Sequence, residues 1–239
     1  MASARTPSRL VLALLVVLTL AACGRVAPAP TPAHLPTATM TAASPPRFRA
    51  IDPAHTALLV MDMQQGIVAL AGPTADSLTA RIATAERASR AAGVMVGFVE
   101  TEFAPDYSDV PRNNKEFAPL AGSGKLIRGD PDTQLDPRVA PAGAEPVIVK
   151  DRVGAFSTDS LDQVLRARNV NTLVLTGIAT SGVVLSTVRV AADLDYRVIV
   201  LSDCVTDPEP EVNRILLEKV FPPQADVINS DQYVATLAH

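Results

Sequence analysis

Residues 176–187 read TGIATSGVVLST and directly follow the apolar run Leu173-Val174-Leu175. The run has the length and composition of a buried strand, and the small residues after Gly177 are typical of the beginning of a helix. In a parallel α/β sheet such a turn lies at the carboxyl end of a strand, where ligands usually bind. This stretch therefore predicts an α/β fold and the position of a binding site.

Strand-like and helix-like patterns alternate along the rest of the chain. We expect strands at 57–61, 94–99, 146–150, 172–176, 197–201 and 225–228, and helices at 76–92, 159–168, 181–194 and 209–220. Short apolar strands separated by helices indicate βαβ units. We therefore predict a doubly wound, mostly parallel six-stranded α/β sheet with helices on both faces.

Residues 101–146 break this rhythm, because they are rich in proline, glycine and asparagine. They contain at best a short helix near 114–120. A connection of this length inside a compact domain is usually a functional lid or a partner surface. We expect it to form part of a binding-site wall and to pack at a subunit interface.

The amino-terminal residues are predicted to be an export signal rather than part of the fold. Arg5 and Arg9 precede an almost wholly apolar run, residues 10–20, which is too short for a comfortable membrane span. A retained helical anchor is the alternative. The stretch Leu20-Ala21-Ala22-Cys23-Gly24 resembles the bacterial lipobox, which implies that residues 1–22 are removed and that Cys23 carries lipid, including a palmitate-type acyl chain.

This resemblance implies a lipoprotein of the bacterial cell envelope. The protein would be held on the outer face of the cytoplasmic membrane, in the periplasm or at the outer membrane. Residues 23–47 form a Pro/Ala/Thr-rich stretch that cannot bury enough apolar surface to fold, so we expect a semi-extended tether. Residues 48–239 then have the length of one α/β domain.

The composition excludes several classes of function. The chain has 239 residues and a formal net charge of −4, with no basic patch that would suit nucleic acid or an anionic lipid surface. Its histidines are His34, His55 and His239, and none lies where the predicted strands end. We therefore expect no histidine-based metal site, no Ser-His-Asp triad and no cofactor. Cys204 is left alone once Cys23 is lipidated, so no intrachain disulfide is expected.

Charged residues follow two of the predicted strands. Asp62 comes directly after the run 57–61, and Lys150 closes the run 146–150. A carboxylate beside a buried strand is partly desolvated, and a lysine nearby would pair with it. Taken separately, Asp62 could be a capping residue and Lys150 a solvated strand end. Backbone N–H groups of the turn at 177–187 could hold an oxyanion, or the turn could serve only close packing.

Together these features resemble the isochorismatase-like superfamily of cysteine hydrolases. The resemblance rests on Asp62, on Lys150 and on the TGIAT turn in this order, and it covers 56–228. The stretch with Lys150, Arg152 and Ala155-Phe156 is similar to the K-x-R-x-x-A-F pattern of isochorismatases. The resemblance implies a homo-oligomeric hydrolase that acts on a small molecule.

The resemblance also implies roles for individual residues. It makes Asp62 and Lys150 catalytic, and it gives the backbone of Ala179, Thr180 and Val183 to an oxyanion site. It further implies a non-proline cis bond between Ala179 and Thr180. Four side chains are implied to bind substrate, namely Gln64, Arg152, Phe156 and Ser181.

The nucleophile position of the family is occupied by Val183, which cannot form a thioester. Ser181 or Ser186 could replace the cysteine, but neither has a base or the direction of the lost side chain. Cys204, at the end of the neighbouring strand, is a second substitute, although a lone cysteine is more often a buried filler. Isochorismatases themselves lack the cysteine and protonate a vinyl ether through the aspartate, although they carry glycine where this chain has valine.

Two hypotheses follow. The first is an isochorismatase-family hydrolase that uses acid–base chemistry of Asp62 and Lys150 without a cysteine nucleophile. The alternative is a catalytically inactive, tethered small-molecule binding protein with the same fold.

Overall fold

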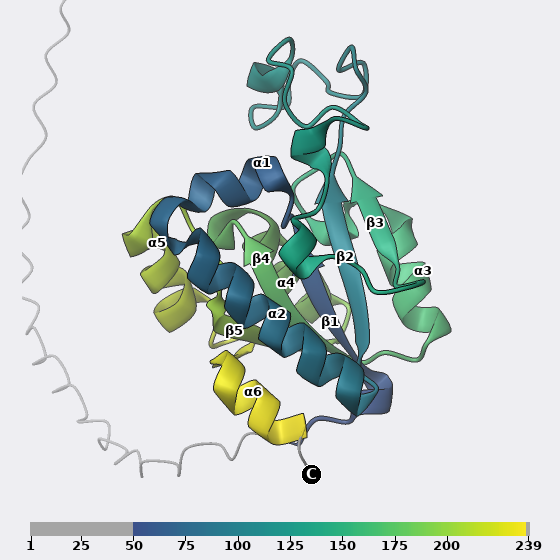
Figure 1. The fold of residues 1–239 in the computed structure, drawn as a ribbon, viewed down its shortest axis with the longest axis vertical. Coiled ribbons are helices and arrows are strands. Elements are labelled where there is room, and N and C mark those ends of the chain that lie inside the picture. The colour runs from purple at the N-terminus through teal and green to yellow at the C-terminus, as the bar shows by residue number, and fades with distance from the viewer. Residues whose placement is uncertain (1–49, 238–239) are drawn as a thin grey trace, which may run out of the picture. The chain divides into compact units, whose positions relative to one another are not determined.

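Six strands form one sheet in the order β3-β2-β1-β4-β5-β6, and every pair of neighbours is parallel (Figure 1). The structure is a computed structural model, and it describes residues 50–237. The strands are β1 (Thr56–Met61), β2 (Met95–Thr101), β3 (Val147–Lys150), β4 (Thr172–Ile178), β5 (Arg197–Thr206) and β6 (Asp226–Ile228). The predicted fold class is confirmed.

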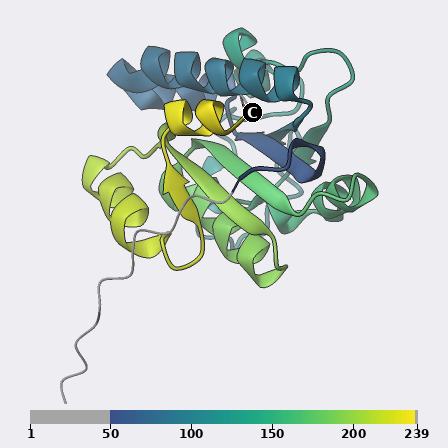
Figure 2. The ribbon, with the colours of Figure 1, turned by 90° about the horizontal axis from the view of Figure 1, so that it is seen from below.

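Helices cover both faces of this sheet. They are α1 (Gln65–Val68), α2 (Ala75–Ala92), α3 (Asp159–Ala167), α4 (Leu185–Asp193), α5 (Pro210–Ile215) and α6 (Ser230–Leu237). Figure 2 shows α2 and α6 on one side of the sheet and α3 and α4 on the other. Each side has its own apolar cluster, because side chains of successive strand residues point to opposite faces.

The central strand β1 shows why the sequence folds this way. All six of its residues are buried. Leu58 and Val60 belong to the cluster under α2, whereas Leu59 and Met61 belong to the cluster under α3 and α4. A continuous apolar run is required of a strand covered on both faces.

Gly177 allows β4 to pass close to β1 at their carboxyl ends. Its φ is 125°, and a Cβ atom added there would lie 1.9 Å from the carbonyl oxygen of Met61. No side chain fits between the two strands at this point. The glycine that ends the apolar run therefore brings the turn after β4 next to the end of β1.

The structure corrects several predicted boundaries. β4 and β5 run on to Ile178 and Thr206, and the helix expected at 181–194 is an irregular helical turn (Thr180–Val184) followed by α4. The helix expected at 209–220 is α5 followed by a second such turn, Leu216–Val220. The turn after β4 bends at Gly182, where φ is −96° and ψ is −106°. Pattern alone does not show this bend, since the composition on both sides of it suits a helix.

Two helices were not predicted, the short α1 and the carboxyl-terminal α6. α6 packs on α2 and β5, and the buried Tyr233 hydroxyl shares a 2.7 Å hydrogen bond with Ser89 Oγ. Tertiary contacts of this kind, rather than the propensity of eight residues, stabilise so short a helix.

The segment 101–146 contains a 3-10 turn, Ala118–Leu120, instead of the expected helix near 114–120. Its first part, the 104–126 loop, leaves the end of β2 and rises beyond α1 (Figure 1). The loop closes where Phe103 pairs with Ile127. The buried Phe103 ring also contacts Phe117, at 5.0 Å between ring centroids. An aromatic side chain at the base therefore holds the loop in place.

The predicted signal (1–22), the lipidated Cys23 and the tether (23–47) lie outside the described residues. Between residues 50 and 237, no helix combines the length and the apolar character needed to cross a membrane.

Candidate active site

Asp62 stands at the point where the chain leaves β1. Its φ of 54° turns the backbone out of the sheet, a conformation that aspartate tolerates better than most residues. Its N–H donates to the carbonyl oxygen of Val99 at 2.8 Å, so the turn is tied to β2. The side chain is 8% exposed. The end of β1 thus places a carboxylate in a nearly closed environment.

Lys150 reaches Asp62 across the intervening strand β2. Its Nζ lies 2.9 Å from Asp62 Oδ2, and its side chain is fully buried. Since β3 and β1 are two strand spacings apart, about 9.6 Å, only a long side chain can span the gap. The predicted contact between the two charged residues is confirmed.

Thr101, the last residue of β2, lies between the two charges and was not identified from the sequence. Its backbone pairs with Lys150 in register. Its hydroxyl accepts from Lys150 Nζ at 2.5 Å and donates to Asp62 Oδ1 at 3.2 Å. Three consecutive strand ends therefore supply one hydrogen-bonded group. The signal in the sequence was weak, since a threonine at the end of a strand is common.

Burial raises the pKa of the Asp62 carboxyl above its usual range, and the charge of Lys150 only partly opposes this effect. The hydrogen bonds from Lys150 and Thr101 act in the same direction as that charge. A raised pKa favours the protonated carboxyl, which is the form that can donate a proton, and the ammonium beside it stabilises the carboxylate left after donation.

Gln64 lies behind the site rather than in it, which corrects its assignment to substrate binding. The side chain is fully buried. Its Oε1 accepts from the Thr101 N–H at 2.8 Å, and its Nε2 donates to the carbonyl oxygens of Thr101 (2.8 Å) and Thr133 (3.0 Å). The amide therefore holds the backbone of Thr101 and fixes the hydroxyl between the two charges.

A cavity of about 540 Å³ opens at this end of the sheet. Asp62, Thr101 and Lys150 contribute to its polar side. The expectation that the 101–146 segment forms a wall is confirmed, because six of its residues beyond Thr101 line the cavity, namely Glu116, Phe117, Leu120, Lys125, Leu126 and Asp132. The volume suits a small organic molecule.

The turn after β4 also lines the cavity. Ile178, Ala179, Gly182 and Val183 line the cavity, and Val183 is 2% exposed. The N–H groups of Gly182 and Val184 both donate to the carbonyl oxygen of Ala179. The position at which the family carries its nucleophile is therefore occupied by an apolar side chain, Val183.

Two details of this turn differ from expectation. The cis peptide bond joins Ile178 to Ala179, one residue earlier than the predicted Ala179–Thr180 bond. Thr180 does not line the cavity, and its hydroxyl donates to Asn213 Oδ1 at 2.6 Å. Of the three residues predicted for an oxyanion site, Ala179 and Val183 border the cavity.

The remaining predicted substrate-binding residues lie elsewhere. Arg152 donates to the carbonyl oxygens of Asp109 and Asp151. Phe156 packs against the core beside Tyr196, at 6.0 Å between ring centroids. Ser181 is exposed, and its N–H donates to Asp207 Oδ2 at 2.7 Å. None of the three lines the cavity, so their positions do not support the predicted roles.

The two substitutes for a thiol nucleophile are also out of reach. Cys204 is fully buried in the apolar cluster under α2 and α6, away from the cavity lining. Burial, reinforced by the neighbouring Asp203, raises the pKa of its thiol. Ser186 is not a lining residue either. In the described part of the chain, no cysteine, serine or histidine borders the cavity, and no group of three or more acidic, histidine or cysteine side chains could hold a metal ion.

Comparisons with known proteins agree with this fold. The family model described as the isochorismatase domain matches residues 56–232. The ureidoacrylate amidohydrolase RutB of Methylobacterium radiotolerans is 34% identical over 183 residues, which is 68% of this chain and 71% of that protein.

Two solved structures are also similar. A cysteine hydrolase from Pseudomonas syringae pv. phaseolicola superposes with a TM-score of 0.72 at 28% identity, over 80% of this chain and 95% of that one. A protein from Burkholderia thailandensis, described as of the isochorismatase family, gives a TM-score of 0.70 at 30% identity, over 80% and 99% of the two chains.

Proposed function

Because this chain belongs to the isochorismatase family of hydrolases, we propose that it hydrolyses a small molecule by acid–base chemistry of Asp62 and Lys150, without a cysteine nucleophile. The observation that carries the proposal is the buried group of Asp62, Thr101 and Lys150 at the wall of a 540 Å³ cavity. Val183, at the family's nucleophile position, supplies no reactive atom.

The chemistry follows from the charges. Protonated Asp62 donates its proton to the substrate, either to the carbon of a vinyl ether or to the leaving nitrogen of an amide. Water adds to the activated carbon, and the bond to the leaving group breaks. The proton that water releases returns to Asp62. Lys150 stabilises the carboxylate between these two steps, and positioned general acids of this kind contribute about 10²- to 10⁴-fold in rate.

The second candidate is a binding protein that retains the cavity without the reaction. The apolar Val183 favours it, because the most direct route to a covalent intermediate in this family is closed. The two candidates differ in the fate of the ligand. An enzyme converts the molecule that it binds, and a binding protein returns it unchanged.

The test is a screen of the purified full-length chain against vinyl ethers and small amides, with products identified by mass spectrometry. Asp62→Asn removes the proton donor. Asp136→Asn is a matched control, since Asp136 is equally buried, also pairs with a cation and lies outside the cavity lining. We expect turnover by the wild type and by Asp136→Asn only. A ligand that binds and is recovered intact from the wild type would support the binding protein instead.

We also propose that the protein is a lipoprotein of the bacterial cell envelope, anchored through Cys23, on the basis of the lipobox-like residues 20–24. Labelled palmitate should enter the wild-type chain in cells and not the Cys23→Ala variant. Equal labelling of the two chains would reject the anchor.

As in other members of the family, we expect a homo-oligomer, and light scattering that gives the mass of a single chain would contradict this.

A further inference from the structure

The cavity has two unlike ends. The polar group of Asp62, Thr101 and Lys150 forms one end, and these three side chains are bonded to one another. Most of the other lining side chains are apolar. A molecule that fills the cavity therefore meets hydrogen-bonding groups at one end and hydrocarbon along the rest of its length.

The outer part of the cavity carries apolar side chains that are left accessible. Leu70, in the turn after α1, is 67% exposed, the largest value for any large apolar side chain described. Phe117 and Leu120 come from the 104–126 loop and line the same cavity. Two separate segments thus offer hydrocarbon to whatever enters, and an isolated exposed leucine would not form such a wall.

The charges of the lining do not favour an anion. Three carboxylic residues (Asp62, Glu116, Asp132) line the cavity against two lysines (Lys125, Lys150), so the lining has no net positive charge even when Asp62 is protonated. Lys150 is already paired with Asp62, and Asp132 Oδ2 accepts from the N–H of Leu126 at 3.0 Å. No arginine borders this cavity in the described part of the chain, although arginine is the usual partner of a substrate carboxylate.

From these observations we infer that the substrate is an uncharged small molecule with an apolar body. Its reactive group lies against Asp62 and Lys150, and its hydrocarbon part extends between Leu70 and the 104–126 loop. The inference rests on the proposed function, because it takes the Asp62 end as the reacting end. It adds the chemical class of the substrate, which differs from that of a small anionic acid.

The test measures dissociation constants of straight-chain amides, from acetamide to octanamide, by calorimetry on the full-length Asp62→Asn chain and on the wild type. The same amides with a carboxylate at the far end serve as the anionic series. We expect each added methylene to tighten binding about two- to fourfold until the cavity is filled. We expect each carboxylated amide to bind at least about tenfold more weakly than its uncharged partner.

Variants locate the effect. Leu70→Ser and Leu120→Ser should flatten the dependence on chain length, because each exchanges hydrocarbon of the wall for a polar group. Leu194→Ser is the control, since Leu194 is a 40% exposed leucine that lies outside the cavity lining. Its dissociation constants for the amides should match those of the chain without this substitution. A flat series in the unsubstituted chain, or tighter binding of the carboxylated amides, overturns the inference.

Failure of this inference and failure of the proposed function give different results. If affinity rises with chain length but the wild type converts no amide or vinyl ether, the apolar class stands and the hydrolase is rejected. If only anionic molecules are bound and hydrolysed, and Asp62→Asn abolishes that turnover, the hydrolase stands and the apolar class is rejected.

Discussion

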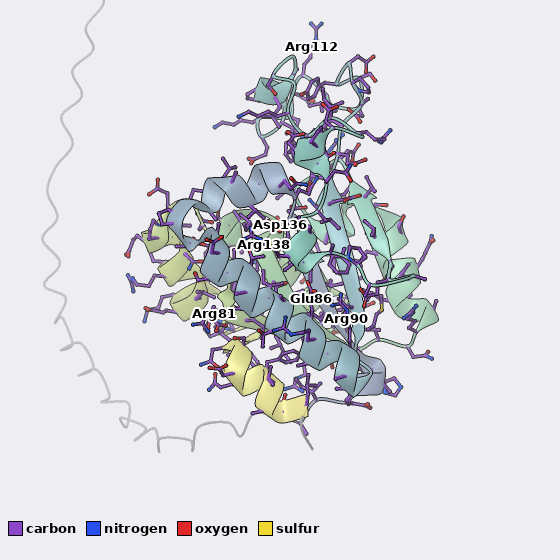
Figure 3. All side chains as sticks on the ribbon, viewed as in Figure 1. Arg81, Glu86, Arg90, Arg112, Asp136 and Arg138 are labelled. Carbon is purple, nitrogen blue, oxygen red and sulfur yellow. The ribbon has the colours of Figure 1, made fainter. Side chains whose placement is uncertain are left out.

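Asp62 and Glu86 are buried carboxylates that each pair with a cation, and of these two only Asp62 lines the 540 Å³ cavity. Asp62 lies 2.9 Å from Lys150 at the carboxyl edge of the sheet. Glu86, on α2, lies 3.0 Å from Arg90, which also binds Glu145 (Figure 3). Burial raises the pKa of both carboxyls, that of Glu86 to about 7.

The difference lies in access and in completeness of bonding. Both oxygens of Asp62 have partners and the group borders the cavity. One oxygen of Glu86 is buried without a partner, and neither Glu86 nor Arg90 lines the Asp62 cavity. A perturbed carboxyl therefore marks a candidate active site only where a substrate can reach it. We expect changes at the first pair to alter turnover and changes at the second to alter stability.

Among the substitutions that keep Asp62, Lys150→Met should produce the largest effect, a fall in kcat of about 100-fold. The variant loses the cation that stabilises the carboxylate left after proton donation. Since Lys150 lowers the pKa of Asp62, its removal raises that pKa further. The limb on which activity falls as Asp62 ionises should thus move to higher pH. A pH profile of kcat measures both effects.

Arg90→Met is the matched control for this prediction, because it removes the cation from the second pair. Its kcat should stay within about twofold of the wild type. An equal loss of kcat in the two variants would show that Lys150 acts through folding rather than through catalysis.

Thr101→Val should reduce kcat about tenfold, because the hydroxyl that joins Asp62 to Lys150 is lost. Thr101→Ser keeps that hydroxyl and should recover most of the rate, which separates positioning from packing. Steady-state kinetics of the two variants, alongside their melting temperatures, provide the measurement. A serine variant as slow as the valine variant would contradict the role given to the hydroxyl.

Glu86→Gln should change the pH dependence of stability and leave kcat unaltered. The pKa of Glu86 in the folded state, about 7, exceeds the ordinary glutamate value of 4.5. The folded state therefore binds more protons than the unfolded state between these values, and wild-type stability falls as pH rises through them. Glutamine cannot ionise, so the variant should avoid about 1–2 kcal/mol of this loss.

Urea unfolding at pH 4.5 and at pH 8 gives the difference for each chain. Glu116→Gln, which alters an exposed carboxyl, is the control and should follow the wild type. Parallel curves for the wild type and Glu86→Gln would remove Glu86 as the source of the pH dependence.

Val183→Ala should have the smallest effect on chemistry, with kcat within about threefold of the wild type, since Val183 supplies no reactive atom. Some stability is lost with the buried methyl groups, about 1–2 kcal/mol. Kinetics and thermal unfolding separate the two quantities. A loss of kcat beyond tenfold without a loss of folded protein would show that Val183 takes a direct part in the reaction.

The fold could be predicted because its signals are local. The apolar run before Asp62 identifies a strand buried on both faces, and Gly177 marks the close approach of β4 to β1. The contact of Asp62 with Lys150 was also within reach, since both residues close strands of one parallel sheet. The sequence does not show that β2 lies between them, so Thr101 was missed.

Roles that depend on side-chain direction could not be predicted. Gln64 stands two residues from Asp62, yet it points to the backbone of Thr101. Arg152 and Phe156 are near Lys150 in the chain, but contacts with Asp109 and Tyr196 hold them away from the cavity. Spacing along the chain carries no information about such long-range partners.

Catalysis by Asp62 without a cysteine is tested most directly by comparing kcat of Asp62→Asn with that of Cys204→Ala on the same substrate. Cys204 is the one cysteine among residues 50–237, and its loss removes a thiol with little change in volume. We expect a fall of about 10³-fold for Asp62→Asn and a change within threefold for Cys204→Ala. Loss of turnover in Cys204→Ala with activity retained in Asp62→Asn would contradict catalysis by Asp62.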